Sequence, residues 1–149
     1  MRYVVGVNVD QLDAVLVEKL RERGQRVTSQ RLVIHRALAA RPQHLTAEQV
    51  HAAVSERLPG TSLPTVYATL ELFEQLGLAR RLSTGMGPVL FDSRTAPHAH
   101  AVCRTCGSVL DVDLSAPAGA LERARTGGFA PDQAEVVVWG TCRACRRGG

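Results

Sequence analysis

Apolar residues in the first part of the chain recur at the spacing of α-helices. Residues 10–20 place four of them on one face of a helix: Leu12, Val15, Leu16 and Leu20. Gly24 follows in the position where glycine commonly ends a helix. We therefore expect a first helix over residues 10–20, with its charged side chains facing water.

The next two helices have recognisable start signals. Thr28 can cap a second helix, which should end before Pro42 because the residue preceding a proline avoids the helical conformation. Thr46 and Gln49 match a capping box, in which each side chain bonds a backbone amide near the other. The predicted apolar face of this third helix comprises Val50, Ala53, Val54 and Leu58.

A fourth helix and a hairpin follow. Ser62 can cap the helix and Gly77 can end it. The period of apolar residues then changes from about 3.6 to about 2 in residues 78–82 and 89–91, which flank a glycine-containing turn. Helices followed by a two-stranded wing predict a winged helix-turn-helix domain, in which the helix beginning at Ser62 is the recognition helix.

Beyond Asp92 the pattern is one of short strands around a single helix. The predicted elements are strands at 100–103, 109–113 and 135–140 and a helix at 114–126. We expect residues 1–92 to form the winged-helix domain and residues 93–149 to form a second, small α/β domain. The predicted fold class is therefore α+β.

All four cysteines lie in two C-x-x-C pairs, Cys103 with Cys106 and Cys142 with Cys145. Two such pairs can supply the four thiolates of a closed tetrahedral zinc site. Two disulfides or a redox-active C-x-x-C are the alternatives, but no thioredoxin-like βαβ pattern surrounds either pair. We predict a structural zinc ion that stabilises a domain too small for a large core.

Harder ligands lie beside the first cysteine pair. His98 and His100 are two residues apart, so on a strand their imidazoles would face the same side. Asp111 could reach the same point if its strand pairs with theirs. This arrangement suggests a second metal of a different kind, whereas solvated loop histidines are the alternative reading.

The predicted recognition helix and wing carry residues suited to DNA. On the functional reading they contact base edges and phosphates, and on the alternative reading the helix is a core helix with a solvated polar face. The predicted contacts are Thr65, Tyr67 and Thr69 on the helix and Arg80 and Arg81 on the wing.

Charge and hydropathy say little about which partners the protein binds, but they bear on its location. The formal charge of +4 and a pI near 9.2 permit nucleic-acid binding without requiring it. The apolar residues 1–9 are too few for a signal peptide, and no apolar run approaches the ~20 residues of a membrane-spanning helix. We expect a cytoplasmic protein with reduced thiols and no membrane partner.

Several segments resemble the Fur family of metal-dependent bacterial repressors. They are residues 26–31 (RVTSQR), 44–48 (HLTAE), 65–70 (TVYATL) and 98–107 (HAHAVCRTCG), together with the closing cysteine pair. The resemblance covers nearly the whole chain. It implies a transcriptional repressor and not an enzyme, with no small-molecule substrate. It also implies a homodimer that reads an inverted repeat in double-stranded DNA, with Arg26 among the DNA contacts and the C-terminal domain as the dimerisation domain.

The resemblance further implies a regulatory metal site. Its ligands would be His44, Asp92, His98, His100 and Asp111. Nitrogen and oxygen donors without sulfur suit Fe(II) or Mn(II) better than zinc. Aspartate at both carboxylate positions is most similar to the peroxide-sensing, PerR-type branch. In that branch Fe(II) and peroxide oxidise a ligating histidine, here His44 or His98, and the repressor releases DNA.

Three alternatives remain open from the sequence. An iron- or manganese-uptake regulator of the same family would share the fold and ligands but ignore peroxide. A small metalloenzyme could use His98, His100 and Asp111 around an open coordination position. A zinc-ribbon interaction module would bind a protein partner and leave the predicted recognition helix unused.

Overall fold

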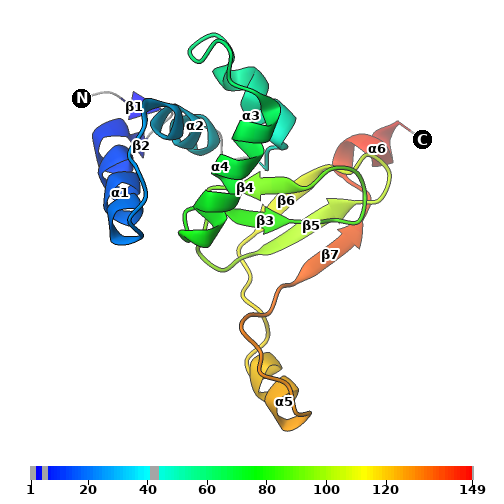
Figure 1. Cartoon of the computed structure of the whole chain (residues 1–149). Helices are drawn as coiled ribbons and strands as arrows, with labels where there is room; N and C mark the ends of the chain where they lie inside the picture. The colour runs from blue at the N-terminus through cyan, green and yellow to red at the C-terminus, as the bar shows by residue number, and fades with distance from the viewer. Residues whose placement is uncertain (1–2, 5–6, 41–43, 149) are drawn as a thin grey trace. The chain divides into compact units, whose positions relative to one another are not determined.

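The computed structural model describes residues 3–4, 7–40 and 44–148. The chain divides into two units, Met1–Thr95 and Ala96–Gly149, each with its own internal contacts (Figure 1). Each unit is described by itself below. Pro42, at which we expected the second helix to stop, lies outside the described residues.

The first unit is mainly helical and carries two small hairpins. Its elements are β1 (Tyr3–Val4), β2 (Val7–Asn8), α1 (Val9–Glu22), α2 (Ser29–Ala39), α3 (Ala47–Val54), α4 (Leu63–Gln75), β3 (Arg80–Leu82) and β4 (Leu90–Asp92). The second unit alternates strands with short helices. Its elements are β5 (Ala99–Cys103), β6 (Val109–Val112), α5 (Ala120–Thr126), β7 (Val137–Gly140) and α6 (Arg143–Arg147).

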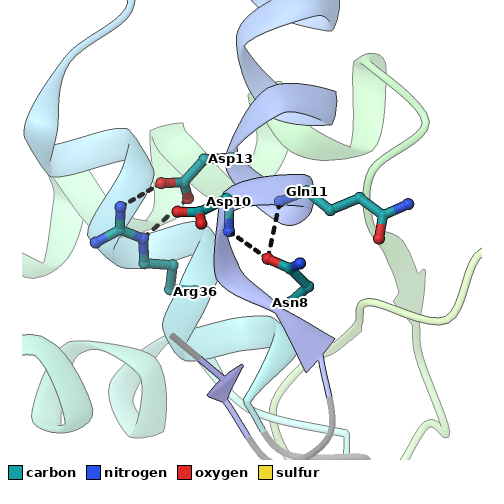
Figure 2. A network of polar contacts seen from close by, with 5 residues as sticks. All are labelled: Asn8, Asp10, Gln11, Asp13 and Arg36. Carbon is teal, nitrogen blue, oxygen red and sulfur yellow. Dashed lines mark hydrogen bonds and ion pairs between the residues drawn. The ribbon is translucent and has the colours of Figure 1, made fainter. Parts of the chain in front are cut away.

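Polar contacts fix the start of α1 and join it to α2 (Figure 2). The Asn8 side chain accepts hydrogen bonds from the backbone amides of Asp10 and Gln11, which caps α1. Arg36 on α2 pairs with Asp13 on α1, and its Nε donates to Oδ1 of Asp13 at 2.9 Å. The ion pair therefore holds two neighbouring helices together at the edge of their apolar contact.

The core of the first unit gathers most of the apolar residues that the helical spacing predicted. Val15 of α1 is an exception, because it is 41% exposed. Leu16 and Leu20 of α1 pack with residues of α2, α3 and α4, and Phe73 lies fully buried among them. The predicted caps of the later helices are confirmed: Thr46 and Gln49 form a reciprocal capping box, and the Ser62 hydroxyl accepts from the amide of Thr65. These local hydrogen bonds satisfy amide groups that the helix itself leaves unpaired.

The wing is an antiparallel pair of β3 and β4. Gly77 ends the preceding turn with φ of 70°, a conformation that strains residues with a Cβ. Phe91 in β4 also bridges to Leu45, with hydrogen bonds in both directions of 2.9 and 2.7 Å. This bridge places the residues flanking it, His44 and Asp92, next to one another.

The second unit is built on a three-stranded sheet with the order β6-β5-β7. β5 pairs antiparallel with β6 and parallel with β7, so the central strand carries His100 and Cys103, and His98 directly precedes it. α6 follows β7 directly, whereas α5 stands away from the sheet and contains no buried residue (Figure 1). The predicted α+β class is confirmed by these elements.

Three expected elements are clearly shorter than the sequence predicted. α3 ends at Val54 and does not continue to Leu58, and Ala53 is exposed instead of facing the core. The helix expected from residue 114 begins only at Ala120, after Gly119, because Pro117 disfavours helical geometry in the residue before it. The strand expected over 135–140 covers only Val137–Gly140.

Candidate metal centres and nucleic-acid interface

Parallel pairing of β5 with β7 brings the two cysteine pairs together. Cys103 lies opposite Gly140, and the amide of Arg104 donates to the Gly140 carbonyl at 2.8 Å. The Sγ atoms of all four cysteines lie within 4.8 Å of one another. Gly107 closes the first knuckle with φ of 73°. The cluster therefore has the donor set and compactness of a tetrahedral zinc site.

The four cysteines are free thiols and form no disulfide. The closest hydrogen-bonded pair, Cys106 and Cys142, has a sulfur–sulfur distance of 3.7 Å, well beyond the ~2.05 Å of a disulfide. The alternative of two disulfides is therefore excluded in this structure. Four thiols at this separation are positioned to share one ion.

Hydrogen bonds make the cysteines electrostatically unequal. The amide of Cys142 donates to Sγ of Cys103 at 3.3 Å, and this bond, with further backbone amides, lowers the pKa of Cys103 to about 5. Hydrogen bonds that the Cys145 thiol donates to the sulfurs of Cys142 and Cys106 raise the pKa of Cys145 to about 12. Backbone amides thus stabilise the thiolate form of Cys103, whereas Cys145 retains its proton most strongly. A divalent cation that replaces the shared protons would remove this conflict.

In the second unit, strand register brings two histidines and an aspartate together. His100 pairs directly with Asp111 across β5 and β6, and Nε2 of His100 lies 3.9 Å from Oδ1 of Asp111. Nε2 of His98 lies 3.4 Å from the same oxygen, and the two imidazole centroids are 4.5 Å apart. Both histidines are at most 5% exposed.

The orientation of His98 is set by its second ring nitrogen. Nδ1 of His98 lies 2.8 Å from the carbonyl oxygen of Ala96, so in the tautomer that donates this bond Nε2 carries the lone pair. A hydrogen-bonded Nδ1 with Nε2 directed at a carboxylate is the usual arrangement of a metal-ligating histidine. The expectation that Asp111 reaches the histidines through strand pairing is confirmed.

A separate His–Asp pair lies in the first unit. Nε2 of His44 is 3.5 Å from Oδ2 of Asp92, and both side chains are more than nine-tenths buried. The other carboxylate oxygen of Asp92 accepts from the amide of Arg94 at 2.8 Å, which fixes the direction of Oδ2. His44 and Asp92 are far apart in sequence, and the bridge between Leu45 and Phe91 is what makes them neighbours.

The first unit also has a basic hollow beside α4. Its volume is about 420 Å³, and it is lined by Arg26, Thr28, Gln30, Arg31, Thr65, Ala68 and Thr69. Three predicted DNA contacts meet here: Arg26, Thr65 and Thr69. Thr28, Gln30 and Arg31 were not predicted, although they lie in the segment of residues 26–31 that carried the family resemblance.

Several of the predicted DNA contacts make hydrogen bonds or ion pairs within the first unit. Tyr67 projects from α4, and its hydroxyl donates to Oε1 of Glu48 at 3.0 Å. Thr69 is 7% exposed, and its hydroxyl donates to the Thr65 carbonyl of its own helix. Arg81 stacks on Phe91 and pairs with two acidic residues of α4, Glu71 and Glu74. Thr69 and Arg81 therefore stabilise the unit internally, and the half-buried Tyr67 packs against the core as well.

No helix in the described part of the chain is long and apolar enough to cross a membrane. A winged helix, a basic hollow beside its fourth helix and clustered metal-binding side chains together define the class of metal-responsive transcriptional regulators. Residues 22–138 match the model of the ferric uptake regulator family, and the chain belongs to this family. Members of the family are transcriptional regulators and not enzymes.

Similar proteins include regulators with different names. The transcriptional regulator FurA of Mycobacterium tuberculosis is 36% identical over 86% of this chain and 88% of its own length. The peroxide operon regulator of Bacillus subtilis is 32% identical over 88% of this chain and 91% of its own length. The structure of the Pseudomonas aeruginosa ferric uptake regulator with manganese is 30% identical, has a TM-score of 0.65, and covers 85% of this chain and 97% of that chain.

Proposed function

We propose that this protein is a homodimeric repressor whose operator binding depends on a regulatory metal, and that peroxide is its signal. The observation that carries the proposal is the donor set. Three histidines and two aspartates occur in two buried groups, His44 with Asp92 and His98 with His100 and Asp111. None of the five donors is sulfur, which favours Fe(II) or Mn(II).

The two groups would share one ion. Each group alone supplies only two or three protein ligands, whereas together they supply five for an ion that prefers about six. An ion held by residues from both units would bind most tightly when the units are close enough to share it. The metal would therefore favour one arrangement of the repressor, which is how a ligand shifts a conformational equilibrium.

The four-cysteine cluster would hold a separate, structural zinc ion. Its donors are all soft thiolates, and four protein ligands leave no open position for a reacting molecule. Because of this difference in donor chemistry, we propose a structural role for the cysteine cluster and a sensing role for the two His/Asp groups. The zinc would keep β5 and β7 aligned and so hold His98 and His100 in place.

Peroxide sensing would use the histidines as its targets. Bound Fe(II) would supply the electrons that reduce peroxide and thereby generate an oxidant next to a ligating imidazole. Oxidation of His44 or His98 would remove one ligand, and the DNA-binding arrangement would lose the metal's stabilisation. Mn(II) would support DNA binding without this chemistry.

DNA would be held by α4 and the basic hollow beside it. Thr65 and Tyr67 are the proposed contacts to base edges, and Arg26 is a proposed phosphate contact that Arg31 would assist. Arg80 on the wing would add a second phosphate contact. A two-fold symmetric dimer would present two such surfaces, which suits an inverted repeat in double-stranded DNA.

The test begins with an operator selected from random DNA by the Mn(II)-bound protein. Anaerobically prepared Fe(II) and Mn(II) forms are then exposed to a peroxide pulse, and DNA retention and histidine oxidation are measured on the same samples. We expect only the Fe(II) form to release DNA and oxygen to be added at His44 or His98. His51 is the internal control, because it bonds the Thr61 carbonyl and belongs to neither ligand group.

A second candidate follows from the FurA relative, which is somewhat more similar to this chain than the peroxide operon regulator. If both metal forms retain DNA after peroxide and no histidine is oxidised, the protein is an iron- or manganese-responsive uptake regulator. The DNA-binding part of the proposal would survive that result, whereas the peroxide-sensing part would not.

A further inference from the structure

The first unit contains a hollow that neither the metal sites nor the DNA-binding surface uses. It has a volume of about 310 Å³ and lies where α1 and α2 meet the residues that follow α4 and β4. Leu12, Val15 and Leu78 contribute apolar walls, and Ser93 and Thr95 contribute hydroxyl-bearing side chains. For comparison, an apolar cavity of ~150 Å³ is large enough to bind benzene.

His35 is the polar group of this hollow. The residue is only 3% exposed, and its Nδ1 is buried without a hydrogen-bond partner among the residues that the structure describes. Its ring packs edge-on against Phe73 at a centroid distance of 5.2 Å, which fixes the imidazole between the core and the hollow. A buried ring nitrogen without a partner costs free energy that a bound hydrogen-bonding group would recover.

The charge state of His35 restricts the kind of ligand. Burial lowers the pKa of His35 to about 4, so the ring is neutral at physiological pH and offers one donor and one acceptor. The nearest carboxylate, Asp13, is already paired with Arg36. Neither His35, which is neutral, nor Asp13, which is paired, therefore gives the hollow a charge that would attract an ion.

We propose that this hollow is a binding site for a small uncharged molecule that has an apolar ring and one hydroxyl group. The apolar walls would bury the ring, and the hydroxyl would exchange a hydrogen bond with His35. A hydroxyl can donate to one tautomer of the imidazole and accept from the other. Pockets that bind small molecules commonly combine apolar walls with a few such polar groups.

Such a ligand would contact two segments with other proposed roles. Leu78 follows the C-terminal end of α4, and Ser93 follows Asp92 directly. The site is nevertheless independent of the proposed function, because no metal ligand or DNA contact belongs to its walls.

The test compares phenol with benzene on the full-length, zinc-bound protein. The ring nitrogens of His35 are followed by nuclear magnetic resonance while each compound is added. We expect a saturable shift with phenol and a dissociation constant at least fivefold lower than that of benzene. Absence of a saturable change with either compound would show that the hollow holds only water and overturn the proposal.

Two variants localise the binding. His35→Phe keeps an aromatic ring against Phe73, and we expect it to bind benzene but to reduce the preference for phenol to less than twofold. Ala39→Leu narrows the hollow and should abolish binding of both compounds, while Ala40→Leu, one position beyond the walls, should bind as the parent does. Equal phenol binding by the parent and Ala39→Leu would contradict the proposed location.

Discussion

His100 and Asp111 lie directly opposite one another in the antiparallel pair of β5 and β6, eleven positions apart in the sequence. Their side chains fall on one face of the sheet because paired residues of neighbouring strands share a face. His98, two residues before His100, shares that face and reaches the same carboxylate oxygen. Strand register alone therefore assembles the second unit's share of the proposed regulatory site.

Replacing Asp111 by alanine should weaken Mn(II) binding at least tenfold. Both histidines approach this carboxylate, so its loss removes a hard oxygen ligand and a partner that orients the rings. Mn(II) titration followed by electron paramagnetic resonance measures the change. Asp113→Ala is the matched control, since Asp113 is exposed and outside the cluster. Equal affinity of Asp111→Ala and the parent would remove Asp111 from the ligand set.

Replacing Cys142 by serine should release zinc and unfold the second unit. The substitution removes one of the four clustered thiols, and a sheet of three short strands has little apolar burial to compensate for a lost metal. Metal content by mass spectrometry and amide exchange of residues 96–149 would report the two effects. The amides of α1 to α4 should remain protected. Full zinc retention would contradict the assignment of this cluster.

Acid should weaken the first unit through His35. The folded-state pKa of His35 is about 4 against 6.5 for an ordinary histidine, because burial disfavours the charged ring. Between these pH values the unfolded chain binds more protons, so the free energy of unfolding falls as pH is lowered from 6.5 to 4. The loss at pH 5 should be about 2 kcal/mol.

The measurement is urea unfolding of the parent and of His35→Phe at pH 7 and pH 5. The variant lacks the titrating ring, so its difference between the two pH values should be smaller than that of the parent by about 2 kcal/mol. Contributions of the other ionisable groups are common to both proteins and cancel in the comparison. An unchanged pH dependence in the variant would show that His35 is not held neutral by burial.

The ion pair between Asp13 and Arg36 should couple α1 to α2 by about 1 kcal/mol. Both side chains are partly exposed, at 21% and 29%, so water screens the interaction and limits its value. A double-mutant cycle with Asp13→Ala and Arg36→Ala, measured by urea unfolding, isolates the pairwise contribution. The exposed pair of Lys19 and Glu22 on α1 is the control and should give a coupling nearer zero. Equal couplings for the two pairs would contradict a special role for the contact between helices.

Local sequence signals determined much of the first unit. Thr28, Thr46 and Ser62 cap their helices as predicted, because a cap depends on hydrogen bonds to amides only two or three residues away. Apolar spacing likewise predicted which faces of α1 and α4 are buried. The two cysteine pairs indicated a metal cluster because their spacing suits a tight knuckle whatever fold surrounds them.

Tertiary structure decided what depends on residues far apart in the chain. The bridge from Leu45 to Phe91 makes His44 a neighbour of Asp92, and nothing in the local sequence around either residue specifies that contact. Contacts across the fold also pair Arg81 with Glu71 and Glu74, a pairing that the sequence prediction of a DNA contact at Arg81 did not include. His35 likewise lies buried beside a hollow because segments distant in the sequence pack around α2. Caps and periodicity act within a few residues, whereas burial and side-chain pairing are set only when distant segments pack together.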